Sequence, residues 1–207
     1  LTAEAVSHAI TANDWERTAR LFRPVNHELL ANGDHKQVRR WLQPIPSDII
    51  EQSPDLLLAL AWSTHLASTR SSDAMEPLER AEDLWTAREE WTGVGQVLVL
   101  KARIAGCAKK NEEALKHARR ALQLLAADAY AARCHAHSRV ATAERIGGNS
   151  TEAKKNFQAC LDMGLAHDCP FPMFAAAHLL ARMEMRAGHL KLAESSLLKI
   201  VAHHPCL

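Results

Sequence analysis

The sequence predicts an all-α fold, arranged as a right-handed superhelical array of antiparallel helix pairs. Apolar residues recur at steps of three and four positions, and no stretch of useful length alternates as a β-strand would. The second half of the chain also resembles itself when it is shifted by about 40 residues. Repeats of that length are typical of α-solenoids, in which each helix pair stacks on the next. We therefore expect residues 1–207 to form one helical-repeat domain, with this period running through residues 71–207.

Small residues mark where the helices of each pair should cross. Gly188 aligns with Gly148, and Ala181 aligns with Ala141 and, one repeat earlier, with Ala102. A second set of small residues follows the first at a constant offset: Ala114, Ala153 and Ala193. Two helices approach closely only where neither side chain is large. These alanines therefore predict the contact points between the two helices of successive pairs.

The elements of the first third are predicted from caps and prolines. A helix over residues 2–12 ends at Asn13, and Asp14 caps the next helix, which Pro24 should break or kink. The chain then continues helically over residues 25–32 to Gly33, a residue suited to ending a helix. Later signals predict, in order, a helix over residues 35–42 capped by Asp34 and closed by Pro44, a single turn over residues 47–51, and an apolar helix over residues 55–68 that Pro54 begins.

The remaining elements are long helices separated by short turns. Ser71, Ser72 and Asp73 offer caps for a helix that runs to about Arg88, with Pro77 tolerated near its first turn. After Trp91 the predicted helices cover residues 92–108, 111–126, 129–146, 150–163, 171–187 and 190–203, and Pro205 stops the last of them. The recurring small residues, the large apolar residue that follows them and the final proline resemble the tetratricopeptide repeat. The resemblance implies a TPR-like α-solenoid.

Composition limits the classes of function. Apolar residues make up 47% of the chain but aromatic residues only 5%, which suits close helix packing. A formal net charge of +1 leaves no basic excess for a nucleic-acid surface. No apolar run reaches the about 18 residues of a membrane helix, and an odd number of cysteines on apolar faces indicates a reducing cytoplasm. We also expect Trp62 to lie in the core and Trp91 to be exposed.

A second resemblance lies in residues 9–62. The features that carry it are Asp14-Trp15-Glu16, Leu29-Leu30-Ala31 before Gly33, Trp41-Leu42, Pro46, Ile49-Ile50, Pro54 and the run from Leu57 to Trp62. They resemble the start of the helical-repeat domain of MalT-like regulators, which are large ATP-dependent members of the LuxR family of bacterial transcription activators. Residues 1–70 are accordingly interpreted as family-like N-terminal repeats.

The MalT-like resemblance implies a sensor domain that binds a small-molecule inducer or a partner protein. In such regulators an ATPase domain precedes this segment, and a helix-turn-helix domain that contacts DNA follows it. The sequence itself holds no GxxxxGK[ST] phosphate loop and no recognition-helix segment with a basic surface. Because it opens on Leu1, we expect it to be an excerpt of a longer polypeptide.

No residues predict an enzyme, a cofactor or a metal. Three histidine–cysteine groups occur, but none has the second short-spaced ligand pair that zinc requires: His135 and His137 beside Cys134, His167 near Cys169, and His203 and His204 near Cys206. Acidic residues are scattered and unpaired, which gives general acid–base catalysis no support. We expect no enzymatic activity in this chain.

The predicted stacking indicates a binding surface instead. The first helices of successive pairs should line the concave side, where Val99, Gly106 and Met185 would point inward. The polar candidates for ligand or partner binding on this side are Gln96, Arg103, His135, Ser138, Thr142, Arg145, His178, Arg182 and Arg186. Of these, Arg103, Arg145 and Arg182 form a track for an anionic or hydroxyl-rich ligand, since guanidinium groups make forked hydrogen bonds. The alternative is a hydrated inner face without a ligand.

Three interpretations therefore stand side by side. The first is a MalT-like sensor domain that binds an inducer or partner. The second is a free-standing TPR-like scaffold that recognises a peptide or helix of another protein. The third is an enzyme with an all-α active site. Apolar faces at the ends of the array could also drive self-association.

Overall fold

A computed structural model describes residues 2–67 and 71–203. Every regular element in this part of the chain is helical, and no strand occurs in it. The elements are α1 (Thr2–Thr11), α2 (Trp15–Asn32), α3 (His35–Leu42), α4 (Ser47–Gln52), α5 (Pro54–Ala67), the 3-10 turn η1 (Ser71–Ala74), α6 (Met75–Ala87), α7 (Trp91–Cys107), α8 (Asn111–Leu124), α9 (Tyr130–Ile146), α10 (Ser150–Ala166), α11 (Pro170–Arg186) and α12 (Leu190–His203). The prediction of an all-α fold is confirmed.

The predicted caps of α2 are confirmed, but the predicted break at Pro24 is wrong. Asp14 Oδ1 accepts a hydrogen bond from the N–H of Arg17 at 3.1 Å, and the helix then continues through Pro24. Phe22 and Val25, on either side of the proline, are both buried in the core, which holds the adjoining turns in place. Gly33 ends the helix in the left-handed conformation, at φ +79°.

The start of α6 also differs from the prediction. Ser71 and Asp73 form a 3-10 turn, and α6 begins after Ala74 without a side-chain hydrogen bond to cap it. Ala74 is buried, so packing rather than a polar cap fixes this boundary. Pro77 falls in the first turn of the helix, as predicted.

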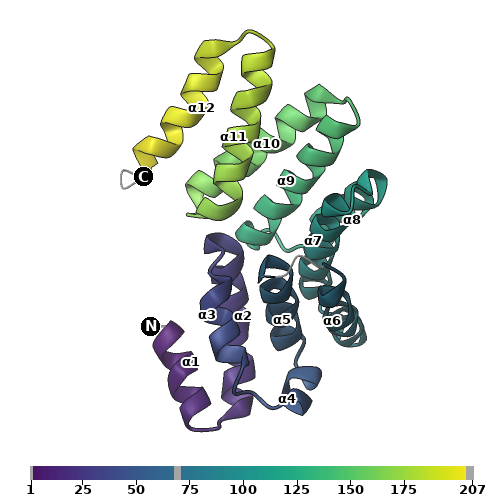
Figure 1. Ribbon diagram of the computed structural model, residues 1–207, viewed down its shortest axis with the longest axis vertical. Helices are drawn as coiled ribbons and strands as arrows, with labels where there is room; N and C mark the ends of the chain where they lie inside the picture. The colour runs from purple at the N-terminus through teal and green to yellow at the C-terminus, as the bar shows by residue number, and fades with distance from the viewer. Residues whose placement is uncertain (1, 68–70, 204–207) are drawn as a thin grey trace.

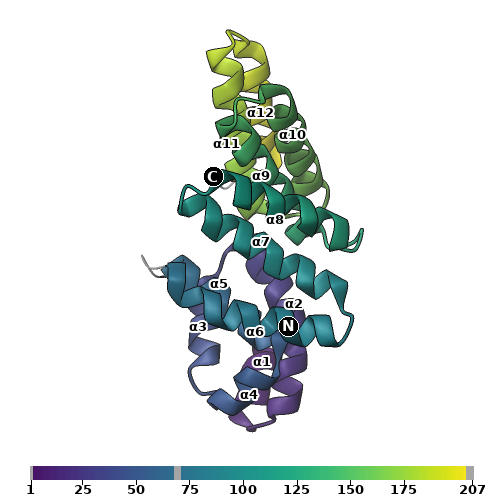
Figure 2. The same ribbon diagram turned by 90° about the vertical axis from the view of Figure 1, so that its right-hand side faces the viewer.

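The later helices pack as consecutive pairs, and the alanines predicted at their crossings are buried. α7 packs against α8, α9 against α10, and α11 against α12, while α7, α9 and α11 also contact one another in sequence (Figures 1 and 2). Ala102 lies in a small apolar cluster with Ala118 of α8 and Val140 of α9. All the alanines that the sequence placed at crossings are buried: Ala102, Ala114, Ala141, Ala153, Ala181 and Ala193.

The turns within these pairs repeat the same backbone geometry. Lys109, Gly148 and Gly188 occupy equivalent positions, and all three have positive φ, at 61°, 87° and 80°. In each turn the next residue's N–H donates to a carbonyl near the end of the preceding helix, as from Asn149 to Glu144 at 2.9 Å. A left-handed residue costs glycine little, whereas it strains a side chain that carries a Cβ.

We expect Lys109→Gly to stabilise the protein by about 0.5–1 kcal/mol, because glycine relieves the strain at φ 61°. Gly148→Ala should instead destabilise it by about 1 kcal/mol, although no atom lies within 4 Å of the added methyl group. Urea unfolding of both variants measures the two signs. Equal effects of the two substitutions would contradict the shared turn geometry.

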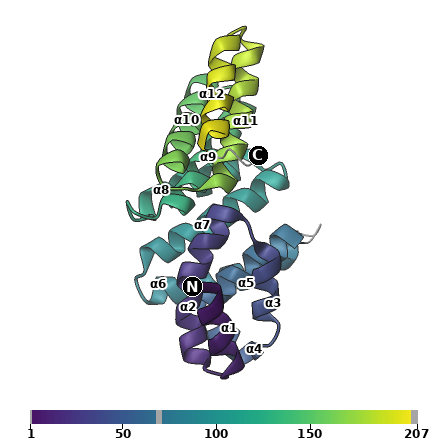
Figure 3. The ribbon, with the colours of Figure 1, turned by 90° about the vertical axis from the view of Figure 1, so that its left-hand side faces the viewer.

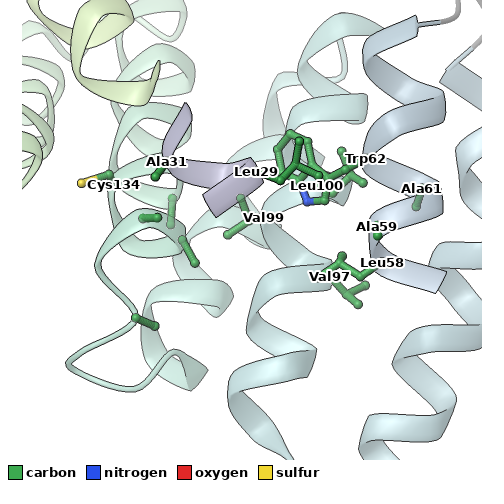
Figure 4. Close-up of a cluster of buried hydrophobic side chains, with 14 of the residues drawn as sticks. Leu29, Ala31, Leu58, Ala59, Ala61, Trp62, Val97, Val99, Leu100 and Cys134 are labelled. Carbon is green, nitrogen blue, oxygen red and sulfur yellow. The ribbon is translucent and has the colours of Figure 1, made fainter. Parts of the chain in front are cut away.

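Helix α2 joins the N-terminal helices to the later pairs. It packs against α5, α9 and α11, so residues distant in the sequence meet along its C-terminal half (Figure 3). Leu29 and Ala31 belong to the same buried cluster as Val99 and Cys134 (Figure 4). A Cβ on Gly33 would lie 3.1 Å from the ring of Phe171 in α11. The inner side of α7 and α9 is therefore covered by the chain's own N-terminal segment.

Candidate functional site

The residues predicted to line one open concave face lie in different environments. His135 and Ser138 are 3% and 1% exposed, so the prediction that they line an open surface is wrong, and Val99 is buried as well. The burial follows from the packing of neighbouring helices over the inner sides of α7 and α9. The half-buried members of the set are Gln96, Arg103, Gly106, Thr142 and Arg145, and the exposed ones are His178, Arg182, Met185 and Arg186.

Arg103 is the predicted residue with the most developed surroundings. Its guanidinium carbon lies 5.9 Å from the ring centre of Trp62 in α5 and 5.7 Å from that of Phe171 in α11. The ring of His135 lies against the same two aromatic rings, at 5.4 Å and 5.5 Å. Cation–π contacts of this kind favour a guanidinium even where water is scarce. The site thus forms where three long helices, α5, α7 and α11, meet around α9.

His65 contacts Arg103 from α5. Arg103 Nε donates a hydrogen bond to His65 Nε2 at 3.1 Å, so the imidazole accepts at that nitrogen and carries its proton on Nδ1. Burial, followed by the positive charges of Arg103 and Arg139, lowers the pKa of His65 to about 4. His65 is therefore neutral at physiological pH, and its Nδ1–H is a buried donor without an acceptor.

The lowered pKa of His65 predicts acid sensitivity. The unfolded chain takes up a proton near pH 6.5, whereas the folded protein resists it until about pH 4, so stability falls as the pH drops between these values. We expect the wild type to lose about 2 kcal/mol more than His65→Gln across this interval. Chemical unfolding at a series of pH values measures the difference. Parallel curves for the two proteins would show that His65 titrates normally.

Arg139 is a second guanidinium within electrostatic range of Arg103. Burial first, and then the charge of Arg103, lower the pKa of Arg139 to about 10. Its Nη2 donates to Ser138 Oγ at 3.3 Å, while its buried Nε has no hydrogen-bond partner. Within the described residues, neither Arg103 nor Arg139 forms an ion pair with a carboxylate. We call His65, Arg103 and Arg139 the arginine cluster.

A small cavity adjoins the arginine cluster at Arg139. Its volume is about 130 Å³, and its lining comes from the C-terminal halves of α7 and α9 and the start of α8. The lining residues are Gly106, Cys107, Asn111, Ala114, Arg139, Thr142, Ala143 and Ile146. Cys107 and Ile146 are exposed, so the cavity reaches the surface. The predicted residue Thr142 therefore lines a real cavity, together with Arg139, which sequence reasoning missed.

The other predicted polar residues do not join this site. Gln96 lies in a separate cavity of about 280 Å³ beside Arg23, Asp55 and Glu90. There Arg23 pairs with Asp55 at 3.6 Å and with Glu90 at 2.6 Å, so the charges are largely matched within the protein. Trp91 borders the same cavity and is 48% exposed, as predicted, whereas Trp62 is 1% exposed, as predicted.

Three of the cysteines are buried, free thiols. Cys134, Cys160 and Cys169 are buried and free, and hydrogen bonding within this group together with burial raises the thiol pKa of Cys134 and Cys169. Among the described residues there is no group of three or more histidine, cysteine or acidic side chains placed to hold a metal ion. His204 and Cys206 lie outside the described residues.

Sequence reasoning identified Arg103 but missed its partners. His65 and Arg139 have no counterpart in the repeat pattern, and Arg139 is adjacent to Ser138 on a helix whose predicted inner face did not include it. The signal that was available is the position of His65 in an otherwise apolar helix, one turn after Trp62. A polar ring at such a position indicates a buried partner.

Comparison with known proteins shows a weak similarity to a transcriptional regulator. No profile of a known protein family matches the chain, and no solved structure matches it. None of the described helices has the length and apolar character needed to cross a membrane. A curated protein, the HTH-type transcriptional regulator MalT of Serratia proteamaculans, is 28% identical over 170 residues, which cover 80% of this chain and 18% of MalT. The chain is thus weakly similar, over most of its length, to a segment of a transcriptional regulator about five times as long.

Proposed function

We propose that this chain is the signal-sensing domain of a MalT-like, LuxR-family transcriptional regulator. In this proposal it is a cytoplasmic, TPR-like superhelical domain that binds an inducer or a partner protein and has no enzymatic activity or cofactor of its own. DNA contact belongs to a helix-turn-helix domain that follows it, and ATP hydrolysis belongs to a domain that precedes it. The observation that carries the proposal is the similarity to MalT over 170 residues.

The position of the arginine cluster supports a sensing role. The cluster lies between α5, α7 and α9, next to the region where α2 packs on α9 and α11. A ligand that binds better to one arrangement of these helices shifts the population toward that arrangement. Binding at this junction would therefore act on the contact of α2 with α9 and α11.

The gene surrounding this segment tests the proposal. We expect the coding sequence to continue upstream into a phosphate-loop ATPase and downstream into a helix-turn-helix domain. In that full-length protein, replacing residues 1–207 by a flexible linker should make transcription from the cognate promoter independent of the inducing signal, as measured with a reporter gene. A coding sequence that lacks both flanking domains would contradict the sensor proposal.

A scaffold that binds another protein is the second candidate. Helix α12 exposes an unusual number of large apolar side chains for a surface helix: Leu190, Leu192, Leu197, Leu198 and Val201, each between 42% and 67% exposed. Exposed apolar patches of this kind mark protein interaction surfaces. Self-association through this face is one form of the same behaviour, and sedimentation of the chain before and after Leu198→Lys distinguishes it from a monomer.

A further inference from the structure

We infer that the arginine cluster and the cavity beside Arg139 bind an oxyanion, the carboxylate or phosphate group of a small ligand. The inference names the chemical class of the ligand for the sensing role proposed above. Its biological role rests on that proposed function, whereas anion binding itself can be tested on this chain alone. Three independent features carry it: unpaired donors, unneutralised charge and the size of the cavity.

The unpaired polar atoms around Arg103 are all donors. Five buried side-chain atoms among the described residues have no hydrogen-bond partner, and three of them are Trp62 Nε1, His65 Nδ1 and Arg139 Nε. An indole nitrogen and a guanidinium nitrogen can only donate, and His65 donates through Nδ1 because its Nε2 accepts from Arg103. A buried donor without an acceptor is costly, so the site favours a ligand that brings acceptors only.

The charges in the same place are positive and unbalanced. Arg103 and Arg139 repel each other, and the neighbouring His65 is neutral because its protonation is disfavoured there. The terminal nitrogens of Arg103 form no hydrogen bond with a described residue, so its forked donors are available. By contrast, other partly buried cations of the chain have acidic partners: Lys101 pairs with Glu82, and Lys154 with Glu184. An oxyanion in the cavity would give Arg139 the counter-ion that it lacks and would also reduce the electrostatic repulsion between Arg139 and Arg103.

The cavity selects the size of the group that enters. A volume of about 130 Å³ corresponds to roughly four water molecules at about 30 Å³ each. That is sufficient for a carboxylate or a phosphate group, and the rest of a larger ligand would lie outside the cavity, which opens at Cys107 and Ile146. Thr142, whose hydroxyl donates to the Ser138 carbonyl at 2.8 Å, adds a polar wall on the side of α9.

Thermal unfolding of the 207-residue chain with defined anions tests the inference. The probes are inorganic phosphate and succinate, each compared with sodium chloride at equal ionic strength. We expect at least one of the two oxyanions, at saturation, to raise the Tm by about 5 °C, and chloride to leave it unchanged. A Tm shift with phosphate would assign the ligand to the phosphate class, and a shift with succinate would assign it to the carboxylate class. Absence of a shift with both, or an equal shift with chloride, would overturn the inference.

Matched variants locate the effect. Arg103→Met and Arg139→Met should each weaken binding of the active oxyanion at least tenfold by isothermal titration, because each removes one charge-assisted partner. Arg120→Met removes an exposed arginine of α8, which bonds only Gln123 among the described residues, and should retain full affinity. Without any anion, Arg139→Met should melt at or above the wild-type temperature, since it removes a buried charge without a counter-ion.

The variant data separate a ligand site from a merely structural arginine. If Arg139→Met lowers the Tm in the absence of anions and the oxyanion shift persists in it, Arg139 is structural and the inference fails. The measurements are made on the purified chain, so their outcome is independent of the flanking gene. If the gene encodes the flanking domains but the chain binds no anion, only this inference fails. If the chain binds an anion but the gene lacks the flanking domains, only the regulator proposal fails.

Discussion

Gly93→Ala is expected to destabilise the protein by about 3 kcal/mol, whereas the same substitution at Gly106, on the same helix, should stabilise it by about 0.5 kcal/mol. A Cβ on Gly93 would lie 2.3 Å from the indole of Trp85, far inside van der Waals contact. Trp85 is only 1% exposed and is enclosed by the core, so the ring cannot move aside without disturbing its neighbours. At Gly106 no atom lies within 4 Å, and alanine only improves helix propensity.

Urea unfolding at constant temperature measures the free energy of unfolding of Gly93→Ala and Gly106→Ala. Both variants replace a glycine of α7 by alanine, so differences in helix propensity largely cancel and packing remains. An unchanged slope of free energy against urea would show that the unfolded states are comparable. If Gly93→Ala proved neutral, the close approach of α6 and α7 at Trp85 would be incorrect.

Leu29→Ala carries the second large effect, a loss of about 3 kcal/mol. Leu29 is 3% exposed and lies in the cluster that holds Val99 and Leu100 of α7 and Cys134 of α9 (Figure 4). Truncation leaves a cavity that neighbours on two separate helices, α7 and α9, cannot close together. Because α2 makes the long-range contact with α9 and α11, we also expect amide exchange in α11 to accelerate in this variant.

Leu192→Ala is the matched control for Leu29→Ala. Leu192 is also a helical leucine, but it is 56% exposed on α12, so its truncation should change the free energy of unfolding by less than about 0.5 kcal/mol. Equal losses from the two substitutions would mean that α2 does not pack against the later helices. If amide exchange in α11 of the Leu29→Ala variant stays at the wild-type rate, the packing of Leu29 does not stabilise α11.

Local features of the fold could be predicted because neighbouring residues produce them. The carboxylate of Asp14 reaches the N–H of Arg17 within one turn, and Gly33 accepts a left-handed backbone without strain. The alanines at 102, 141 and 181 are buried at helix crossings because any larger side chain there would separate the pairs. Pro24 is the exception, since the core around Phe22 and Val25 outweighs the missing hydrogen bond.

The candidate site could be predicted only in part. Arg103 was recognised from its place one residue after a crossing alanine, which puts it on the side of α7 that faces the neighbouring helices. Its partners His65, Arg139 and Phe171 come from α5, α9 and α11. No spacing in the chain relates these residues, and the burial of His135 and Ser138 depended on which helices cover α9.

The sequence by itself determined the helices, their order, their pairing and the small residues at each crossing, because these depend on side chains within about one repeat of each other. Only the tertiary structure decided that α2 returns to pack on α9 and α11 and that two arginines meet without a counter-ion. Helix α2 is separated from α9 and α11 by many intervening helices, so its contacts with them are set by the sum of many packings. No single stretch of residues encodes that sum.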